Sequence, residues 1–292
     1  MRRRAWVLNF DAEDELARGT RPWPSRVELR RMEALASRLR GTLVPAGDAV
    51  VFPTDEVGDV KGLDGVAWCV TPWSRRVLTD RGARERSTVD PAVVARVNHR
   101  AWMVGLGALL DGARYVTDAT ALDAVMAGAW PRGGWLLKRP WSYAGRGRLH
   151  LRTRDELGVE RHVGWLRRSM ATGGVMVEPH VERVVDLALH GWIGEGRAER
   201  GALTRQVCDA AGAWVSTERW EVDAWWRAEV ERAFDETTAA LAREGYRGPF
   251  GVDGFVWRDD AGRERVQPRS DVNARYTMGW AVGMGDRRPD LA

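Results

Sequence analysis

The sequence has almost no lysine. Only Lys61 and Lys138 are lysines among 45 basic residues, and arginine takes every other basic position. Lysine and arginine side chains each carry one positive charge. A lysine in such an arginine-rich chain therefore indicates a position that needs the compact ammonium group. Lys138 ends the apolar run in "GGWLLKRPWSYAGRGRL", residues 133–149, directly before a glycine-rich turn. Lys138 is therefore the first candidate functional residue.

Cysteine is also scarce, and long apolar runs are missing. Cys69 and Cys208 stand far apart with no second thiol nearby, so both are expected to be buried structural thiols. The short apolar run 5–8 is interrupted at once by "DAEDE", which argues against a signal peptide. No run approaches the ~20 residues that a membrane span needs. We expect no membrane partner and a cytoplasmic location.

A large excess of one charge is absent as well. The net charge is +4, and the basic residues are interleaved with 41 acidic ones, which argues against a nucleic-acid partner. The 16 tryptophans are scattered along the chain, a pattern typical of core and interface packing before base stacking. A chain of 292 residues that is 44% hydrophobic can bury a sizeable core. A homodimer is compatible with this composition.

The first third of the chain alternates strand and helix patterns. We expect strands at 4–10, 48–53 and 65–72, and an amphipathic helix that begins at a Ser25 cap and ends at Gly41. Together these segments predict a small α/β domain. Asp90 and Pro91 then predict the cap and first residue of one long helix that continues to Gly112 and links two domains.

The rest of the chain predicts two further groups of strands. Helices are expected at 119–127 and near 154–170, with strands around 134–140 and 173–181. A cap at Asp223 and a stop at Gly245 predict a long helix between them. Residues 251–267 predict a hairpin that turns at "DDAG".

Lys138 and the glycine turn together suit a phosphate group. An ammonium group at a strand end can neutralise phosphate oxygens, and backbone N–H groups near Gly145 and Gly147 can approach them with no Cβ in the way. The alternative is that the two glycines only shape a hairpin.

Two carboxylates follow some distance along the chain. Glu178 ends the apolar strand of "VMVEPHVERVVDLAL", and Asp186 comes before another apolar stretch. Such a segment can read an adenine edge through its backbone and bind a ribose hydroxyl through a carboxylate. It therefore fits a nucleotide.

Three oxygen-bearing side chains meet on the predicted hairpin. Asp271 and Asn273 are two residues apart on one strand, so both point to one face, and Asp253 lies on the partner strand. Two acids and an amide form an oxygen-only site that suits Mg²⁺ better than zinc or copper. The alternative for "DVNAR" is a capped turn.

In this order and at these separations, "WLLKRPWSYAGRGRL", "VMVEPHVERVVDLAL" and "FGVDGFVWRDDAGRERVQPRSDVNARYTMG" resemble the ATP-grasp superfamily, which includes D-alanine ligase, glutathione synthetase and biotin carboxylase. The match covers residues from about 95 to 285. It implies an α+β fold with an N-terminal α/β domain at 1–88, a linker helix and lid subdomain at 89–177, and a catalytic subdomain at 178–292. ATP would lie between the last two.

The resemblance also implies a role for each matching position. The phosphate contacts are Arg100 and Lys138, and the loop Gly145, Arg146 and Gly147 covers the phosphates. The hinge Glu178, Pro179 and Val181 reads adenine, and Asp186 binds the ribose. The Mg²⁺ ligands are Asp253, Asp271 and Asn273, and the catalytic cations are Arg275 and Lys138. Mn²⁺ can stand in for Mg²⁺. The superfamily usually has glutamate at position 271, and aspartate reaches ~1.5 Å less far, which favours coordination through water.

The implied function is that of an ATP-dependent carboxylate–amine ligase. A small-molecule or peptide carboxylate would be activated as an acyl phosphate, and an amine or similar nucleophile would then displace phosphate. Positioning and charge neutralisation would supply most of the catalysis. Two alternatives stay open: a catalytically degenerate ATP-grasp module that binds nucleotide or a partner protein, and a basic, tryptophan-rich nucleic-acid binder.

Overall fold

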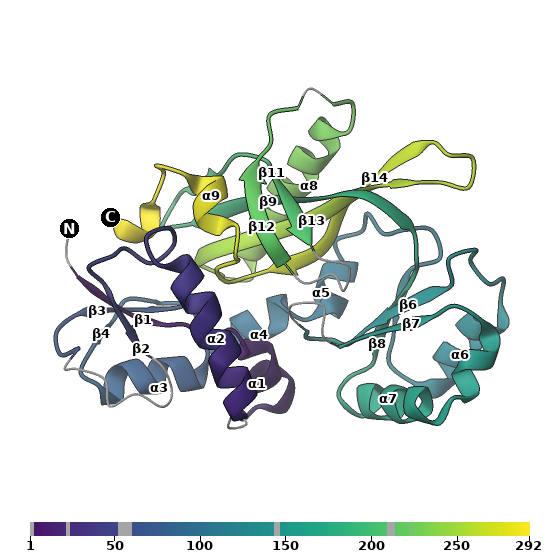
Figure 1. Ribbon diagram of the computed structural model, residues 1–292, viewed down its shortest axis with the longest axis horizontal. Coiled ribbons are helices and arrows are strands. Elements are labelled where there is room, and N and C mark those ends of the chain that lie inside the picture. Colours follow the sequence, from purple (N-terminus) through teal and green to yellow (C-terminus); the bar gives the residue numbers. More distant parts are fainter. Residues whose placement is uncertain (1–2, 22–23, 52–59, 143–146, 209–213, 223) are drawn as a thin grey trace.

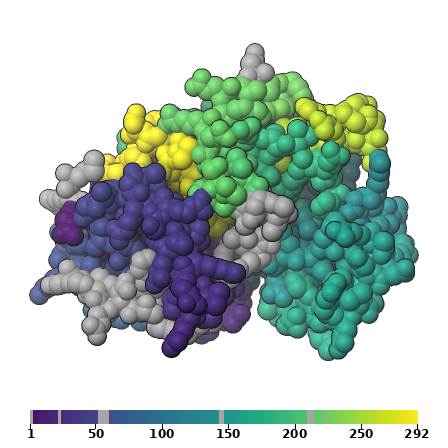
Figure 2. Space-filling view, in the orientation of Figure 1, coloured from purple at the N-terminus to yellow at the C-terminus, as the bar shows by residue number. Residues whose placement is uncertain are grey.

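The computed structural model describes residues 3–21, 24–51, 60–142, 147–208, 214–222 and 224–292. Within these ranges the chain forms three β-sheets, each with its own helices (Figure 1). In Figure 2 the C-terminal region (green and yellow) lies above the N-terminal region (purple) and the middle region (teal). The predicted α+β fold class is confirmed.

The N-terminal sheet is parallel, with strand order β2-β1-β3-β4. Its elements are β1 (Arg4–Val7), α1 (Ala12–Arg18), α2 (Arg26–Leu39), β2 (Ala49–Val51), β3 (Asp64–Ala67), α3 (Pro72–Asp80) and β4 (Arg84–Glu85). Ser25 caps α2 as predicted, in a capping box with Glu28. The strand expected at 65–72 is shorter, because the Thr71 side chain caps α3 and Pro72 begins that helix.

The second sheet is the lid, which we define as residues 114–179. It is antiparallel in the order β5-β8-β6-β7. Its elements are β5 (Arg114–Val116), α6 (Ala119–Ala127), β6 (Trp135–Lys138), β7 (Arg148–Leu151), the 3₁₀ helix η1 (Arg154–Gly158), α7 (Glu160–Ala171) and β8 (Val175–Pro179). Leu137, Leu151 and Val177 form its separate small core with residues of α6. The domain boundaries at 88 and 177 stay predictions.

The third sheet is the largest. It is antiparallel in the order β12-β11-β9-β13-β14, with β10 paired to β9. Its elements are β9 (Glu182–Ile193), β10 (Ala198–Arg200), β11 (Thr204–Cys208), β12 (Trp214–Arg219), α8 (Arg227–Arg243), β13 (Gly248–Arg258), β14 (Glu264–Asn273), α9 (Trp280–Met284) and the 3₁₀ helix η2 (Pro289–Leu291). The predicted β13–β14 hairpin is present. No helix in the described part of the chain combines the length and apolarity of a bilayer crossing.

The predicted linker helix is interrupted. It forms α4 (Pro91–Val97) and α5 (Arg100–Val104) instead of one helix. Asn98 ends α4 and bonds the backbone of Ala274, while the His99 side chain caps α5. These side chains compete with the helix for backbone groups, so the chain turns here.

Two smaller expectations also change. Helix α8 begins at Arg227, with Trp226 at the cap position; the predicted cap, Asp223, lies outside the described residues. Gly245 follows the helix with φ +84°, as a glycine stop requires. Cys69 is buried as expected, but Cys208 is exposed because it ends β11 at the rim of the large sheet.

The end of the chain packs against its beginning. An Arg4 N–H donates to the Leu291 carbonyl at 2.6 Å, and Arg288 donates to the Leu43 carbonyl at 2.8 Å. The Tyr276 ring lies 5.3 Å from the Trp6 ring. The N-terminal sheet and the large sheet therefore share one hydrophobic core.

Candidate active site

A cleft of about 1860 Å³ is lined by residues of the lid sheet, of the large sheet, and of helix α2 and two connecting segments of the N-terminal region. The predicted residues that line it are Arg100, Lys138, Glu178, Pro179, Val181, Asp186, Asp253, Asp271, Asn273 and Arg275. Their elements are far apart in sequence, and the folding of the lid onto the large sheet brings them together (Figure 1). Gly145 and Arg146 lie outside the described residues.

Gly147 is the one described residue of the prediction that does not line the cleft. Its φ is +66°, and a Cβ there would lie 2.8 Å from the Ser142 Cβ. Its carbonyl accepts the Arg139 N–H at 3.0 Å. The turn between β6 and β7 therefore requires glycine at position 147 for its own backbone geometry. This is what the alternative expects, in which the glycines shape a hairpin.

Lys138 and Glu178 form a buried ion pair inside the lid. Their side chains are 3% and 7% exposed, and Nζ lies 2.6 Å from Oε1. Burial lowers the pKa of Lys138, although the Glu178 charge opposes this effect. Arg148 stands directly opposite Lys138 in the β6–β7 ladder. Like charges in opposed positions repel, so this edge of the lid is suited to an anion.

Arg100 connects the lid to the large sheet. Its guanidinium donates to the Asp271 carboxylate at 2.6 Å, to the Arg139 carbonyl at 2.6 Å and to the Ser142 hydroxyl at 2.8 Å. Burial alone would raise the pKa of Asp271, but the Arg100 and Lys138 charges outweigh it and hold that pKa below its usual value. Asp271 is thus an ionised carboxylate in a cationic setting.

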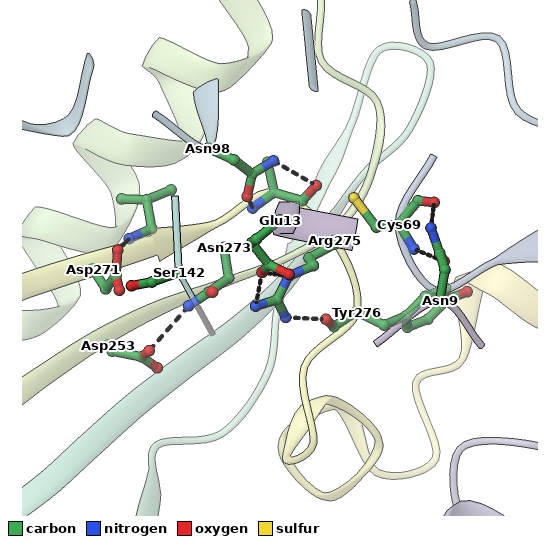
Figure 3. A network of polar contacts seen from close by, with 12 residues as sticks. Asn9, Glu13, Cys69, Asn98, Ser142, Asp253, Asp271, Asn273, Arg275 and Tyr276 are labelled. Atoms are coloured by element: carbon green, nitrogen blue, oxygen red, sulfur yellow. Dashed lines mark hydrogen bonds and ion pairs between the residues drawn. The ribbon is translucent and has the colours of Figure 1, made fainter. Parts of the chain in front are cut away.

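Asp253 lies opposite Asp271 in the β13–β14 ladder. Its carboxylate accepts N–H groups from the Asn273 and Gln206 amides, both at 3.0 Å, and Asn273 points at it in Figure 3. Burial and the neighbouring Asp271 charge raise the pKa of Asp253 to about 6. A bulge at Gly254 breaks the ladder beside it. Among the described residues, only neutral groups are hydrogen-bonded to this carboxylate, so it has capacity for a cation.

The side chains of Asp253, Asp271 and Asn273 carry the kinds of oxygen atom that Mg²⁺ binds. Carboxylate and amide oxygens are the donors that Mg²⁺ prefers, with water and phosphate oxygens completing its shell. Among the described residues no group of three or more His, Cys, Asp or Glu side chains is placed to hold a metal. Asn273 and a ligand phosphate would therefore have to supplement Asp253 and Asp271.

The hinge between β8 and β9 has an available backbone donor. The His180 N–H bonds the Gly134 carbonyl at 2.9 Å, whereas no hydrogen bond within the described residues uses the Val181 N–H. Next along the cleft, Asp186 pairs with Arg183 at 2.8 Å, and Arg183 lies over the Phe255 ring at 4.0 Å. A flat heterocycle with an acceptor nitrogen would suit this edge.

Arg275 is turned toward the N-terminal region (Figure 3). Its Nε donates to Glu13 at 2.7 Å, and NH1 donates to the Tyr276 carbonyl at 2.9 Å. Glu13 is buried, and the Arg275 side chain is only 10% exposed. The sequence did not indicate Glu13 as a candidate site residue, because the "DAEDE" stretch indicated only that the apolar run 5–8 ends there.

Three other residues near the predicted site were also missed. They are Ser142, Arg148 and Gln206. Arg148 carries the one usable signal, since it directly follows the glycine turn after Lys138 and so begins the returning strand of the hairpin. Nothing in the sequence marks Ser142 or Gln206.

No protein-family model matches the sequence, and no curated protein matches it. Solved structures do match in fold. N5-carboxyaminoimidazole synthetase from Staphylococcus aureus, complexed with ADP, is 10% identical with a TM-score of 0.53, over 95% of this chain and 72% of that one. D-alanyl-alanine synthetase A from Vibrio cholerae is 11% identical with a TM-score of 0.53, over 94% and 89%. Phosphoribosylamine–glycine ligase from Thermotoga maritima is 14% identical with a TM-score of 0.55, over 96% and 70%.

Proposed function

We propose that this chain, which has the ATP-grasp fold, is an ATP-dependent carboxylate–amine ligase. The observation that carries the proposal is the meeting of two opposite charge sets in one cleft. Arg100, Lys138 and Arg148 supply cations, and Asp253 and Asp271 of the large sheet supply carboxylates. This arrangement suits a polyphosphate held with a divalent cation.

The nucleotide would lie along the hinge. The Val181 N–H would donate to the adenine ring, and the carbonyl of Pro179 would accept from its amino group. Asp186 would bind the ribose after exchanging its Arg183 partner for a hydroxyl. The phosphates would then reach the cationic edge of the lid, where Lys138 and Arg148 oppose each other.

Two transfers would follow in the cleft. A substrate carboxylate oxygen attacks the γ-phosphorus, and the bond to the ADP oxygen breaks, giving ADP and an acyl phosphate. An amine nitrogen then attacks the acyl carbon, the carbon–oxygen bond breaks, and phosphate leaves as the nitrogen loses a proton. Arg275 would hold the carboxylate and stabilise the charge on its oxygen, and Lys138 would stabilise the transferred phosphoryl group.

Mg²⁺ would be held by Asp253, Asp271 and Asn273. When bound, it would neutralise phosphate charge during transfer. Arg100 would shift part of its contact from Asp271 to the phosphate, while its bonds to Arg139 and Ser142 keep the lid loop in place. Lid closure over the cleft would exclude water from the acyl phosphate.

A second candidate is a nucleotide-binding module without catalysis. One observation favours it: Lys138, Arg275 and Asp271 are each paired with another side chain of this protein. In such a module these pairs would persist when nucleotide binds.

One experiment separates the two candidates. ATP binding is measured by calorimetry, and Mg²⁺-dependent ADP release is screened against amino acids, short peptides and small carboxylic acids, with mass spectrometry of products. The ligase proposal expects ADP release that requires both a carboxylate and an amine. ATP binding without ADP release in any mixture supports the module, and absence of ATP binding rejects both.

A further inference from the structure

A chain of hydrogen bonds leads from the backbone of the large sheet to the cleft through one buried histidine. The Nδ1 atom of His190 lies 3.0 Å from the Thr277 hydroxyl, and Nε2 lies 3.2 Å from the Thr204 hydroxyl. The Thr204 hydroxyl lies 2.9 Å from the Ala188 carbonyl oxygen. His190 and Thr204 are fully buried, whereas Thr277 lines the cleft. Thr277 is thus the end of the chain that a ligand can reach.

The strand register places this chain beside the proposed metal ligands. His190, Gly251 and Asn273 are directly opposed on β9, β13 and β14. Asp253 is two residues from Gly251 on β13, so His190 lies on the face of the sheet that carries Asp253. A Cβ at Gly251 would lie 2.9 Å from the Thr277 Cγ2. Thr277 therefore packs over Gly251, in the strand position next to Asn273.

The position of each hydrogen atom follows from the carbonyl at one end of the chain. A carbonyl oxygen can only accept, so the Thr204 hydroxyl donates to Ala188. Burial lowers the pKa of His190 to about 3, so its ring is neutral at pH 7 and has one N–H. Because the Thr204 hydrogen points to Ala188, the His190 N–H is on Nε2 and donates to Thr204. Nδ1 is then an acceptor, and the Thr277 hydroxyl donates to it.

This direction determines what Thr277 can bind. Its hydrogen is directed to His190, so its oxygen offers only lone pairs to a ligand. A carboxylate or a thiolate has no hydrogen to donate to that oxygen, whereas an amine has. Arg275 also lines the cleft and can only donate. Two residues of chain span at most ~7 Å, so segment 275–277 presents a donor for a carboxylate close to an acceptor for an amine.

We propose that the Thr277 hydroxyl accepts a hydrogen bond from the amine substrate, and that His190 is the positioning residue that fixes the direction of this hydroxyl. The inference rests on the proposed ligase function and assigns a residue that binds its second substrate. An amine N–H bonded to Thr277 leaves the nitrogen lone pair free to attack the acyl carbon near Arg275. The contact therefore selects an amine over a thiolate as the nucleophile.

Nitrogen-15 NMR of the full chain tests the direction of the hydrogen bonds without any substrate. At pH 7.5 we expect a neutral His190 ring with its hydrogen on Nε2. In Thr204→Val the Nε2–H loses its acceptor, so the hydrogen should move to Nδ1 and be donated to Thr277. A hydrogen on Nδ1 in the wild type would overturn the inference, because Thr277 would then be free to donate to a ligand.

The kinetics of ADP release test the role of Thr277. The probes are the carboxylate and the amine that give the fastest ADP release in the substrate screen. Thr277→Val should raise the KM of the amine about 3–10-fold, as one lost hydrogen bond predicts, while the KM values of ATP and of the carboxylate stay unchanged. Thr277→Ser keeps the hydroxyl and should restore the KM of the amine.

Thr238→Val is the matched control, because the Thr238 hydroxyl bonds the Phe234 carbonyl within α8 and does not line the cleft. It should leave all three KM values unchanged. An unchanged amine KM in Thr277→Val, or an equal rise in the KM of all three substrates, would overturn the inference while the wild type releases ADP. Absence of ADP release from the wild type in every mixture would instead reject the proposed function, and the inference with it.

Discussion

Two regions of the molecule treat side chains of opposite character in different ways. In the lid and beside it, Lys138, Glu178, Arg100 and Asp271 are charged and joined in short ion pairs. In the segment before α8, the Trp225 side chain is exposed to solvent. A buried charge needs a partner of opposite charge, because an unpaired one strongly destabilises the fold. Exposing one indole ring costs much less folding free energy. Substitutions among the paired charges should therefore cost more stability than a substitution of Trp225.

The largest effect is expected at the buried lid pair. Lys138→Ala leaves Glu178 as an unpaired buried carboxylate, so the free energy of unfolding should fall by about 3–5 kcal/mol. ADP release should fall by roughly 10² or more, because one preorganised charge is lost. Chemical denaturation and an ADP assay measure the two effects.

Lys61→Ala is the matched control, since Lys61 is the other lysine and is exposed. The double variant Lys138→Met/Glu178→Leu removes both charges, so it should regain stability but not ADP release. Normal turnover in that double variant would show that Lys138 is only structural.

The next effect concerns Asp271, which Arg100 connects to the lid. Asp271→Asn removes one negative charge from the proposed magnesium site, so turnover should fall about 10–100-fold and the half-saturating Mg²⁺ concentration should rise. Asp271→Glu should keep activity. Mg²⁺-dependent ADP formation in the three proteins measures this. Equal magnesium dependence in all three would reject Asp271 as a ligand.

A smaller effect is expected at a buried histidine in the core of the large sheet. His190 is fully buried between Thr204 and Thr277, and burial lowers its pKa from 6.5 to about 3. Below pH 6.5, the unfolded chain therefore binds a proton at His190 that the folded chain does not bind. The stability from neutral His190 is complete above pH 6.5 and is lost as pH falls toward 3, with about 2 kcal/mol lost at pH 5.

Urea denaturation at pH 7.5 and pH 5 measures this loss. His190→Gln should weaken the pH dependence, because glutamine does not titrate. An NMR titration in which the His190 imidazole gains a proton near pH 6.5 without unfolding would contradict the prediction.

The smallest effect is expected in the lid turn. Gly147→Ala places a methyl group against Ser142 at a φ of +66°, so it should destabilise the fold by about 1 kcal/mol. Gly262→Ala is the control, since its φ is +75° with nothing within 4 Å. Thermal unfolding compares the two. A larger loss at Gly262 would show that the contact with Ser142 is not the cause.

The distance in sequence between contacting residues explains what the sequence could predict. The fold class, the hairpin and the predicted residues that line the cleft follow from short motifs, because a strand fixes which side chains share a face. Glu13 and Gln206 could not be found this way, since each meets its partner only after distant segments pack. The contact of Arg38 in α2 with the Trp214 ring could not be found this way either, because no local spacing indicates it. The break at Asn98 was missed because its partner, Ala274, is equally distant.

The bonds from Arg4 to Leu291 and from Arg288 to Leu43 have a consequence for biosynthesis. At roughly 5–20 residues per second, a ribosome makes Leu291 about 15–60 s after Arg4. During that interval β1 can pair with β2 and β3, but its partners from the end of the chain do not yet exist. The N-terminal sheet therefore lacks these bonds, and Trp6 lacks its Tyr276 neighbour, until translation is almost finished. Destabilising substitutions in this sheet should therefore reduce the yield of newly made protein more than they reduce the stability of the finished one.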